Sequence, residues 1–251
     1  MRVIIVKNYD SMSKLAAKFV KEELLKKPDL VLGLATGSTP LGLYKELIRM
    51  YKKEGLDFSK VTTFNLDEYI GLPKDHPESY HTFMWENLFK HININPSNIY
   101  IPDGTVEDIE AHCIWYEEKI AEKGGIDLQI LGIGRDGHIG FNEPGSSLAS
   151  RTRIKTLARE TREDNARFFG GDINKVPKYA ITMGIGTIIE SGKLILLASG
   201  ANKRDAIKKT VEGPITAMVP ASMIQIHPRA IVIIDQEAAS LLEKEYETWE
   251  G

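Results

Sequence analysis

The sequence predicts an α/β fold: a doubly wound, mostly parallel open sheet with helices on both faces, in a Rossmann-like three-layer arrangement. Short runs of apolar residues recur along the chain, and amphipathic stretches with helical spacing separate most of them. Strands that are apolar throughout are buried on both faces, and a helix between two of them makes the right-handed crossover that parallel strands need. In such a sheet, ligands bind at the carboxyl ends of the strands.

The expected elements follow this alternation along the chain. Strands are expected at residues 2–6, 30–35, 61–66, 126–133, 193–199 and 229–235. Helices are expected at residues 13–26, 40–53, 106–123 and 201–212. Residues 141–158 have no simple period, so we expect there a loop that leads into an edge strand.

Length and composition limit the classes of protein. The chain has 251 residues, 42% of them hydrophobic, which suits one domain over residues 1–251. A net charge of -3 with both signs dispersed offers no basic face for a nucleic acid. Cys113 is the only cysteine, and no apolar run is long enough for a signal peptide or a membrane span. We therefore expect a cytoplasmic protein with no nucleic-acid and no membrane partner.

The loop after the second expected strand has the features of an anion site. Thr36, Gly37, Ser38 and Thr39 stand before a helical pattern that begins at or near Pro40. Glycine lets the backbone approach a ligand, and the free N–H groups of a helix start favour a negative charge, most simply a phosphate. The spacing does not match the Gly-Lys-Ser/Thr loop of ATPases. A turn in which Ser38 or Thr39 only caps the helix is an equal alternative.

The third expected strand ends in Asp67. A carboxylate in that position points toward the cleft of a doubly wound sheet, where burial raises its pKa and makes it usable as a base. Asp67 is therefore the candidate for proton abstraction from carbon. An isolated aspartate more often caps the following segment. However, two other loops after strands also carry polar clusters, and three such loops would meet in one crevice.

The loop after the fourth expected strand sets a titratable histidine between two carboxylates. Asp136, His138 and Glu143 stand in the glycine-rich run 132–145. Glycines let the chain turn sharply, so that the carboxylates of Asp136 and Glu143 approach His138 from two sides. They favour the imidazolium and fix the tautomer of the ring. His138 is thus the candidate acid-base residue, which moves a proton to and from a sugar oxygen.

Three other interpretations of this loop stay open. Residues 132–137 match the dinucleotide fingerprint literally, but the sequence that follows does not open a helix, which argues against NAD. One histidine and two carboxylates could hold a metal ion, although such sites usually contain two histidines, and His76, His81, His91 and His112 lie outside the loop. A loop histidine with no role is the third interpretation. We expect no metal and no organic cofactor.

Two basic residues could complete a phosphate pocket. Lys203 is expected in the first turn of its helix, where a cation opposes the helix dipole and gains nothing structurally, so an anionic partner explains it. Arg167 is uninformative by itself.

Several long motifs occur in a characteristic order. They are Leu34-Ala-Thr-Gly-Ser-Thr-Pro40, Thr63-Phe-Asn-Leu-Asp-Glu-Tyr69, His76-Pro-Glu-Ser-Tyr80, Gly134-Arg-Asp-Gly-His-Ile-Gly-Phe-Asn-Glu-Pro144 and Ser146-Ser-Leu-Ala-Ser-Arg-Thr-Arg-Ile-Lys-Thr156. In these motifs the chain closely resembles the glucosamine-6-phosphate deaminase family, from Met1 to about Asp235. The resemblance implies conversion of glucosamine 6-phosphate and water to fructose 6-phosphate and ammonia in amino-sugar catabolism, without a metal or organic cofactor.

The resemblance also implies roles for single residues. His138, held by Asp136 and Glu143, opens the pyranose ring, and Asp67 takes the proton from C2 and delivers it to C1. An aldose-to-ketose proton shift does need a buried carboxylate at carbon and a separate acid-base group at the ring oxygens. The substrate phosphate is bound by Gly37, Ser38, Thr39, Arg167 and Lys203.

A regulatory site is a further implication. In some members of the family N-acetylglucosamine 6-phosphate activates the enzyme from a site between subunits, so we expect a homo-oligomer. The matching positions are Ser146, Ser147, Arg153 and Lys155. An exposed loop is the alternative for these residues. The chain ends short of the tail that contributes a tyrosine in regulated relatives, with Trp249 near that place, which argues against allosteric control.

Two rival functions share this fold. A hydrolase similar to 6-phosphogluconolactonase also needs a phosphate pocket and a histidine. A sugar-phosphate sensor without turnover usually carries a DNA-binding module, and only Met1 precedes the first expected strand. Residues 151–177 are the candidate for a lid over the site.

Overall fold

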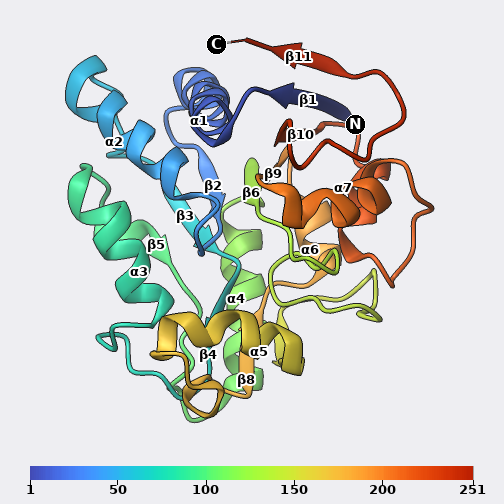
Figure 1. Cartoon of the computed structure of the whole chain (residues 1–251). Helices are drawn as coiled ribbons and strands as arrows, with labels where there is room; N and C mark the ends of the chain where they lie inside the picture. The colour runs from blue at the N-terminus through green and yellow to red at the C-terminus, as the bar shows by residue number, and fades with distance from the viewer. Residues whose placement is uncertain (251) are drawn as a thin grey trace.

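The computed structural model describes residues 1–250 and has an eight-stranded sheet at its centre (Figure 1). The strand order is β11-β1-β10-β9-β6-β2-β3-β5, and all neighbouring pairs are parallel. The strands are β1 (Arg2–Val6), β2 (Val31–Leu34), β3 (Thr62–Asn65), β5 (Ile99–Tyr100), β6 (Leu128–Leu131), β9 (Leu194–Ala198), β10 (Ala230–Asp235) and β11 (Glu247–Trp249).

The strand order reverses between β2 and β6. From β2 the chain moves outward through β3 to β5, and it then returns to β6 on the other side of β2. The loops that follow β2 and β6 therefore begin side by side, at the position where open α/β sheets bind their ligands.

Helices cover both faces of the sheet (Figure 1). On one face pack α1 (Tyr9–Lys26), α2 (Leu41–Glu54) and α3 (Tyr80–Asn87), and on the other α4 (Ile109–Glu122), α6 (Ile185–Ile189) and α7 (Arg204–Val211). Successive residues of β10 show the layering, because side chains alternate across a strand. Ile231 and Ile233 join the first core, whereas Val232 and Ile234 join the second. The predicted three-layer α/β fold is confirmed.

A second, three-stranded antiparallel sheet was not predicted. It consists of β4 (Asp67–Tyr69), β8 (Tyr179–Thr182) and β7 (Arg153–Thr156), in the order β4-β8-β7. Leu66 joins the two sheets: its N–H donates to Leu34 O at 3.1 Å in the large sheet, and its carbonyl accepts from Met183 N at 2.7 Å beside β8. Asp67, expected at the end of the third strand, is thus the first residue of the small sheet.

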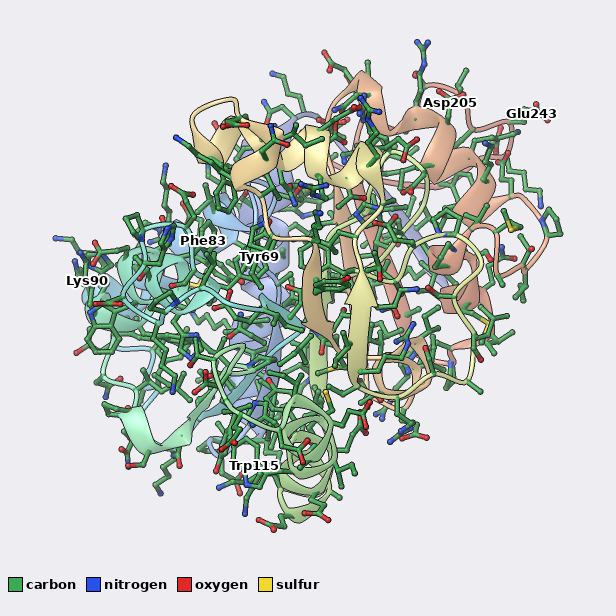
Figure 2. The ribbon with its side chains drawn as sticks, turned by 90° about the horizontal axis from the view of Figure 1, so that it is seen from below. Tyr69, Phe83, Lys90, Trp115, Asp205 and Glu243 are labelled. Carbon is green, nitrogen blue, oxygen red and sulfur yellow. The ribbon has the colours of Figure 1, made fainter. Side chains whose placement is uncertain are left out.

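The small sheet supports helix α5 (Arg159–Asn165) near the end of the large sheet. A separate apolar cluster joins Tyr69 of β4 and Ala180 of β8 to Leu157 and Ala166, which flank α5. This helix lies across the end of the large sheet where β3 leads into β4 (Figure 1). Tyr69 lies in the interior, whereas Lys90 and Asp205 project at the periphery (Figure 2). The edge strand expected within residues 141–158 is β7.

Most differences from the predicted elements concern short segments. The helix expected at 201–212 begins as a 3-10 turn, so Lys203 ends that turn and is the N-cap residue of α7 rather than part of its first turn. β5 and β11 have two and three residues, too few for a period in the sequence. The 3-10 helices are η1 (Phe89–His91), η2 (Pro96–Asn98), η3 (Ala166–Phe169), η4 (Ile173–Lys175), η5 (Ala201–Lys203) and η6 (Pro220–Ile226).

Among residues 1–250, no helix combines the length and apolar character needed to cross a bilayer.

Candidate active site

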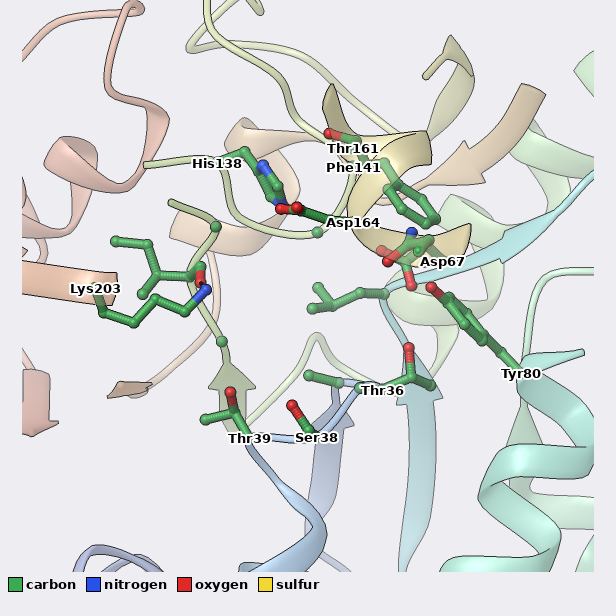
Figure 3. A pocket seen from close by; sticks show the side chains of 18 of the residues that line it. Thr36, Ser38, Thr39, Asp67, Tyr80, His138, Phe141, Thr161, Asp164 and Lys203 are labelled. Atoms are coloured by element: carbon green, nitrogen blue, oxygen red, sulfur yellow. Dashed lines mark hydrogen bonds between the residues drawn. The ribbon is translucent and has the colours of Figure 1, made fainter. Parts of the chain in front are cut away.

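A cavity of about 170 Å³ opens at the reversal point of the sheet (Figure 3). Its wall combines residues 35–39 after β2, the junction of β3 and β4, the loop after β6, and the segment from α5 to η3. Its size suits a small solute rather than a polymer. The residues expected at the site that line this cavity are Thr36, Gly37, Ser38, Thr39, Asp67, His138, Arg167 and Lys203.

Two tyrosines hold the loop after β2 in place. The Tyr9 hydroxyl donates to Ser38 O at 3.0 Å and accepts from Gly42 N at 2.8 Å, and the Tyr44 hydroxyl donates to the carbonyl of Ala35. Gly37 has a φ of +93°, in the left-handed region that glycine tolerates best. The loop is therefore a rigid platform.

The loop after β2, which lines the cavity up to Thr39, leads directly into α2, and no side chain caps this helix. Its N-cap residue is Pro40, which provides no side-chain hydrogen bond, and the first turn contains no acidic residue. The interpretation in which Ser38 or Thr39 caps this helix is therefore wrong. The side chains of Ser38 and Thr39 point into the pocket (Figure 3). Free N–H groups, hydroxyls and the positive end of a helix dipole together make an anion site.

Asp67 is a buried carboxyl at the other end of the pocket, with 5% of its surface exposed. Burial, with a smaller contribution from Glu68, raises its pKa to about 8. Close packing contributes to the burial, because a Cβ added to Gly140 would lie 3.3 Å from Asp67 Oδ2. Ser79 rather than Asp67 caps the next helix. Asp67 thus has the protonation behaviour of a general base for near-neutral pH.

Glu68 anchors the helix beside this carboxyl. Its Oε1 accepts from the backbone N–H groups of Tyr69 and Tyr80 at 2.8 and 3.0 Å, and its Oε2 lies 3.1 Å from His81 N and 3.0 Å from His81 Nδ1. A carboxylate at a helix N-terminus is stabilised by the free donors and the dipole. Glu68 therefore ties α3 to β4 and fixes the position of Tyr80 next to Asp67.

The histidine loop brings both carboxylates to one nitrogen. Asp136 Oδ1 lies 2.7 Å and Glu143 Oε2 3.8 Å from His138 Nδ1. Neither contact has the direction of a good hydrogen bond, so they are ion-pair contacts. The expectation that the carboxylates approach the ring from two sides is thus wrong: both face Nδ1, and among residues 1–250 no carboxylate lies within 4.0 Å of Nε2.

Neighbouring groups hold this cluster. Glu143 Oε1 accepts from Thr161 Oγ1 at 2.5 Å and from Ala158 N at 3.3 Å, which joins the loop to α5. Burial alone would raise the pKa of Asp136, but its contacts with His138 outweigh burial and lower the pKa to about 2. A Cβ added to Gly134 would lie 2.2 Å from His138 Cε1. Glycine is thus required there because the imidazole packs on the backbone.

The alternative of a dinucleotide site has no structural support. The glycines of the fingerprint lie in a loop that continues without a helix through residue 152. A pyrophosphate site of that kind needs a helix to start at the loop.

Two cationic residues, Arg167 and Lys203, line the same pocket as the anion loop. Lys203 Nζ donates to Ile133 O at 2.7 Å, and burial lowers its pKa. Arg167 is exposed, and its guanidinium lies over the ring of Phe168. Arg135 pairs with Asp164, with Nε 3.0 Å from Oδ2, which ties the histidine loop to α5.

Some lining residues were not foreseen. Tyr80, Thr161, Asp164 and Asn165 line the cavity. The Tyr80 hydroxyl donates to the Tyr69 hydroxyl at 3.5 Å, which also accepts from Asn165 Nδ2 at 2.9 Å. Tyr80 ends the motif at residues 76–80, to which no role was assigned, whereas nothing in the local pattern distinguishes Thr161, Asp164 and Asn165.

The residues expected at an effector site lie outside the pocket. Ser146 and Ser147 follow the histidine loop, and Arg153 and Lys155 lie on β7. Arg153 Nη1 donates to Asn142 Oδ1 at 2.9 Å. This group is therefore adjacent to the histidine loop without lining the substrate-sized cavity.

Known proteins resemble the whole of this architecture. Residues 7–233 match a family model described as glucosamine-6-phosphate isomerases/6-phosphogluconolactonase. A glucosamine-6-phosphate deaminase of Thermoanaerobacter pseudethanolicus is 57% identical over 245 residues, which cover 98% of this chain and 96% of that protein. Glucosamine-6-phosphate deaminase 2 of Bacillus subtilis is 55% identical and covers 97% and 98%.

Solved structures also resemble this chain. One described as a monomeric glucosamine-6-phosphate deaminase superposes with a TM-score of 0.94 at 49% identity, covering 96% of this chain and 100% of that one. A 6-phosphogluconolactonase from Trypanosoma cruzi has a TM-score of 0.74 at 22% identity and covers 97% of each chain, a likeness of fold alone.

Proposed function

The chain belongs to the glucosamine-6-phosphate deaminase family, and from that premise we propose that its pocket converts glucosamine 6-phosphate and water to fructose 6-phosphate and ammonia. The observation that carries the proposal is the buried carboxyl of Asp67, whose pKa of about 8 suits a base at carbon, in one cavity with His138. A lactonase hydrolyses an ester and removes no proton from carbon, so it needs no base at that position.

Ring opening is the proposed task of His138. Nδ1 faces two carboxylates and keeps its proton, which leaves Nε2 to exchange a proton with the ring oxygen and the C1 hydroxyl. Asp136, with its pKa lowered to about 2, stays ionised and stabilises the imidazolium that forms. The product of this step is the open-chain amino aldose.

Proton transfer between carbons is the proposed task of Asp67. Its carboxylate takes the proton from C2 and returns it to C1, which gives the imine of the ketose. Water adds to that imine and ammonia leaves, so the atoms balance. A substrate ammonium group beside Asp67 lowers the pKa of the carboxyl and so increases the fraction in the basic form.

The phosphate is proposed to bind at the loop after β2. Thr36, Gly37, Ser38 and Thr39 supply hydroxyls and backbone donors at the start of α2, and Lys203 and Arg167 supply positive charge. A phosphate held there places the sugar between Asp67 and His138, since all these groups line one cavity.

An effector site for N-acetylglucosamine 6-phosphate is proposed at Ser146, Ser147, Arg153 and Lys155. Ser146 Oγ is buried and has no hydrogen-bond partner among residues 1–250, which leaves it available to a ligand or a water molecule. Arg153 donates to Asn142, which immediately precedes Glu143, so a ligand on Arg153 has a route to His138.

A homo-oligomer in the cytoplasm is part of the same proposal. Exposed apolar side chains on α4, β7 and β8 offer a surface for a second copy: Ile114, Ile154 and Tyr179. A similar structure with 49% identity is described as monomeric, so the mass in solution is the decisive test. A solution mass of about one 28.1 kDa chain by light scattering would exclude the oligomer.

One coupled assay tests the function. Purified protein is given glucosamine 6-phosphate, and ammonia and fructose 6-phosphate are measured in parallel, with and without N-acetylglucosamine 6-phosphate. Equal amounts of the two products are expected. A chain that releases neither product but hydrolyses 6-phosphogluconolactone would refute the deaminase.

A further inference from the structure

The cluster around His138 has unused ligand atoms. Asp136, His138 and Glu143 each present one ligand atom, and these atoms lie within 4.8 Å of one another. His138 Nδ1 and Glu143 Oε2 are buried without a hydrogen-bond partner among residues 1–250. The other oxygen of Glu143 is occupied by Thr161 and Ala158, so the carboxylate is held with Oε2 directed at the imidazole.

We propose that these three side chains form a binding site for a borderline divalent cation, with Zn²⁺ as the preferred ion, and that the bound ion inhibits the enzyme. A tetrahedral Zn²⁺ with bonds of about 2.0–2.2 Å places its ligand atoms roughly 3.3 Å apart. The present separations from Nδ1, 2.7 and 3.8 Å, lie on either side of that value. Side-chain rotations would have to bring the three ligand atoms, which lie within 4.8 Å of one another, to that spacing.

The donor set selects the class of ion. One imidazole nitrogen with two carboxylate oxygens suits Zn²⁺, Co²⁺ or Ni²⁺, whereas Mg²⁺ and Ca²⁺ prefer oxygen alone. Two carboxylates and a neutral imidazole also bring the net negative charge that a dication requires. The nearby guanidinium of Arg135 is paired with Asp164, which reduces its repulsion of an ion.

An ion has access through a second cavity beside the cluster. This cavity is lined by Asp136, His138 and Glu143, and it shares His138, Thr161 and Asp164 with the wall of the substrate pocket. The imidazole thus forms part of the wall of both cavities. Solvent in the second cavity can supply the fourth ligand.

Inhibition follows from the chemistry of the ring. An ion on Nδ1 displaces the proton there, so Nε2 carries the remaining one and can release it only by forming an imidazolate. The ring then cannot cycle between imidazole and imidazolium, and ring opening stops. This consequence rests on the proposed function, whereas binding of the ion does not.

Calorimetric titration of the full chain with Zn²⁺ tests the site. One equivalent is expected to bind, and a crystal soaked in Zn²⁺ is expected to show an anomalous peak between the three side chains. The substitutions His138→Gln and Glu143→Gln are each expected to weaken binding by at least about tenfold. Mg²⁺ at the same concentration is expected to give no heat of binding.

Two matched variants separate this site from other ligands. Cys113→Ser removes the only thiol, and His91→Asn removes a histidine outside the cluster, and both are expected to keep the affinity. Loss of Zn²⁺ binding in Cys113→Ser would overturn the proposal. So would a Zn²⁺ affinity in His138→Gln and Glu143→Gln equal to that of the wild-type protein. If one substitution prevents folding, the other variant and the anomalous map decide. An active deaminase that binds no Zn²⁺ refutes the site alone; an inactive chain that binds Zn²⁺ refutes the function alone.

Discussion

Replacement of Asp67 by asparagine removes the proposed carbon base while it keeps the shape of the side chain. Because 5% of Asp67 is exposed and its carboxyl is close to Gly140, a larger side chain would also disturb packing, whereas asparagine does not. The variant is expected to lose about 10²- to 10⁴-fold in kcat, the usual contribution of a general base. Affinity for a non-reacting sugar phosphate is expected to stay within about twofold, since the phosphate groups are unchanged.

The pKa of Asp67 sets the pH dependence of the wild-type enzyme. With a pKa of about 8, roughly one tenth of the free enzyme carries the ionised base at pH 7. The value of kcat/KM is therefore expected to rise with pH up to about 8, and above that pH ionisation of Asp67 gives no further increase.

The same carboxyl makes a stability prediction with a definite sign. Its pKa is raised from 3.8 in a model peptide to about 8 in the folded chain, so between these pH values the folded state holds a proton that the unfolded state has lost. This residue therefore lowers the free energy of unfolding by about 1.4 kcal/mol per pH unit across that window, a total on the order of 5 kcal/mol. Asparagine does not titrate, so the variant gains stability over wild type as the pH rises.

Three measurements decide the case. Exchange of the C2 proton is followed by NMR in deuterated water, kcat/KM is measured from pH 6 to 9, and urea unfolding of both proteins is compared at pH 5 and 8. Normal proton exchange in Asp67→Asn would place the base elsewhere. A stability difference that does not grow with pH would show that the carboxyl is not buried in the neutral form.

Three further substitutions test other parts of the site. His138→Gln is expected to slow reaction of the closed ring at least about 100-fold while an open-chain analogue binds normally; equal losses for both would contradict a role in ring opening. Gly134→Ala places a methyl group where the His138 ring lies, so kcat is expected to fall by more than about tenfold with little change in KM, and a fully active variant would show that the ring can move freely. Lys203→Met is expected to raise KM for the phosphorylated sugar by about tenfold or more, and an unchanged KM in steady-state assays would remove Lys203 from the phosphate site.

Local sequence was sufficient for the framework of the large sheet. The six predicted strands form because each is a continuous apolar run, which is buried in the sheet regardless of which strands pair with it. The predicted loops lie at one edge of the sheet because the carboxyl ends of parallel strands point the same way. The small sheet was missed for the opposite reason. β4 and β7 pair through β8, a strand far away in the chain, so no short window contains the information.

The chemistry at the site also depends partly on local sequence and partly on tertiary structure. By itself, the sequence determined which residues have chemistry to offer: a carboxyl after β3, a histidine among acids, and hydroxyls before a helix, because residue type and spacing are local properties. Only the tertiary structure decided that Asp136 and Glu143 meet at one nitrogen, that Glu68 holds Tyr80 beside Asp67, and that burial raises the pKa of that carboxyl to about 8. Burial and directed contacts depend on chain segments that meet only in the folded state, and these set the strength of a base or an acid.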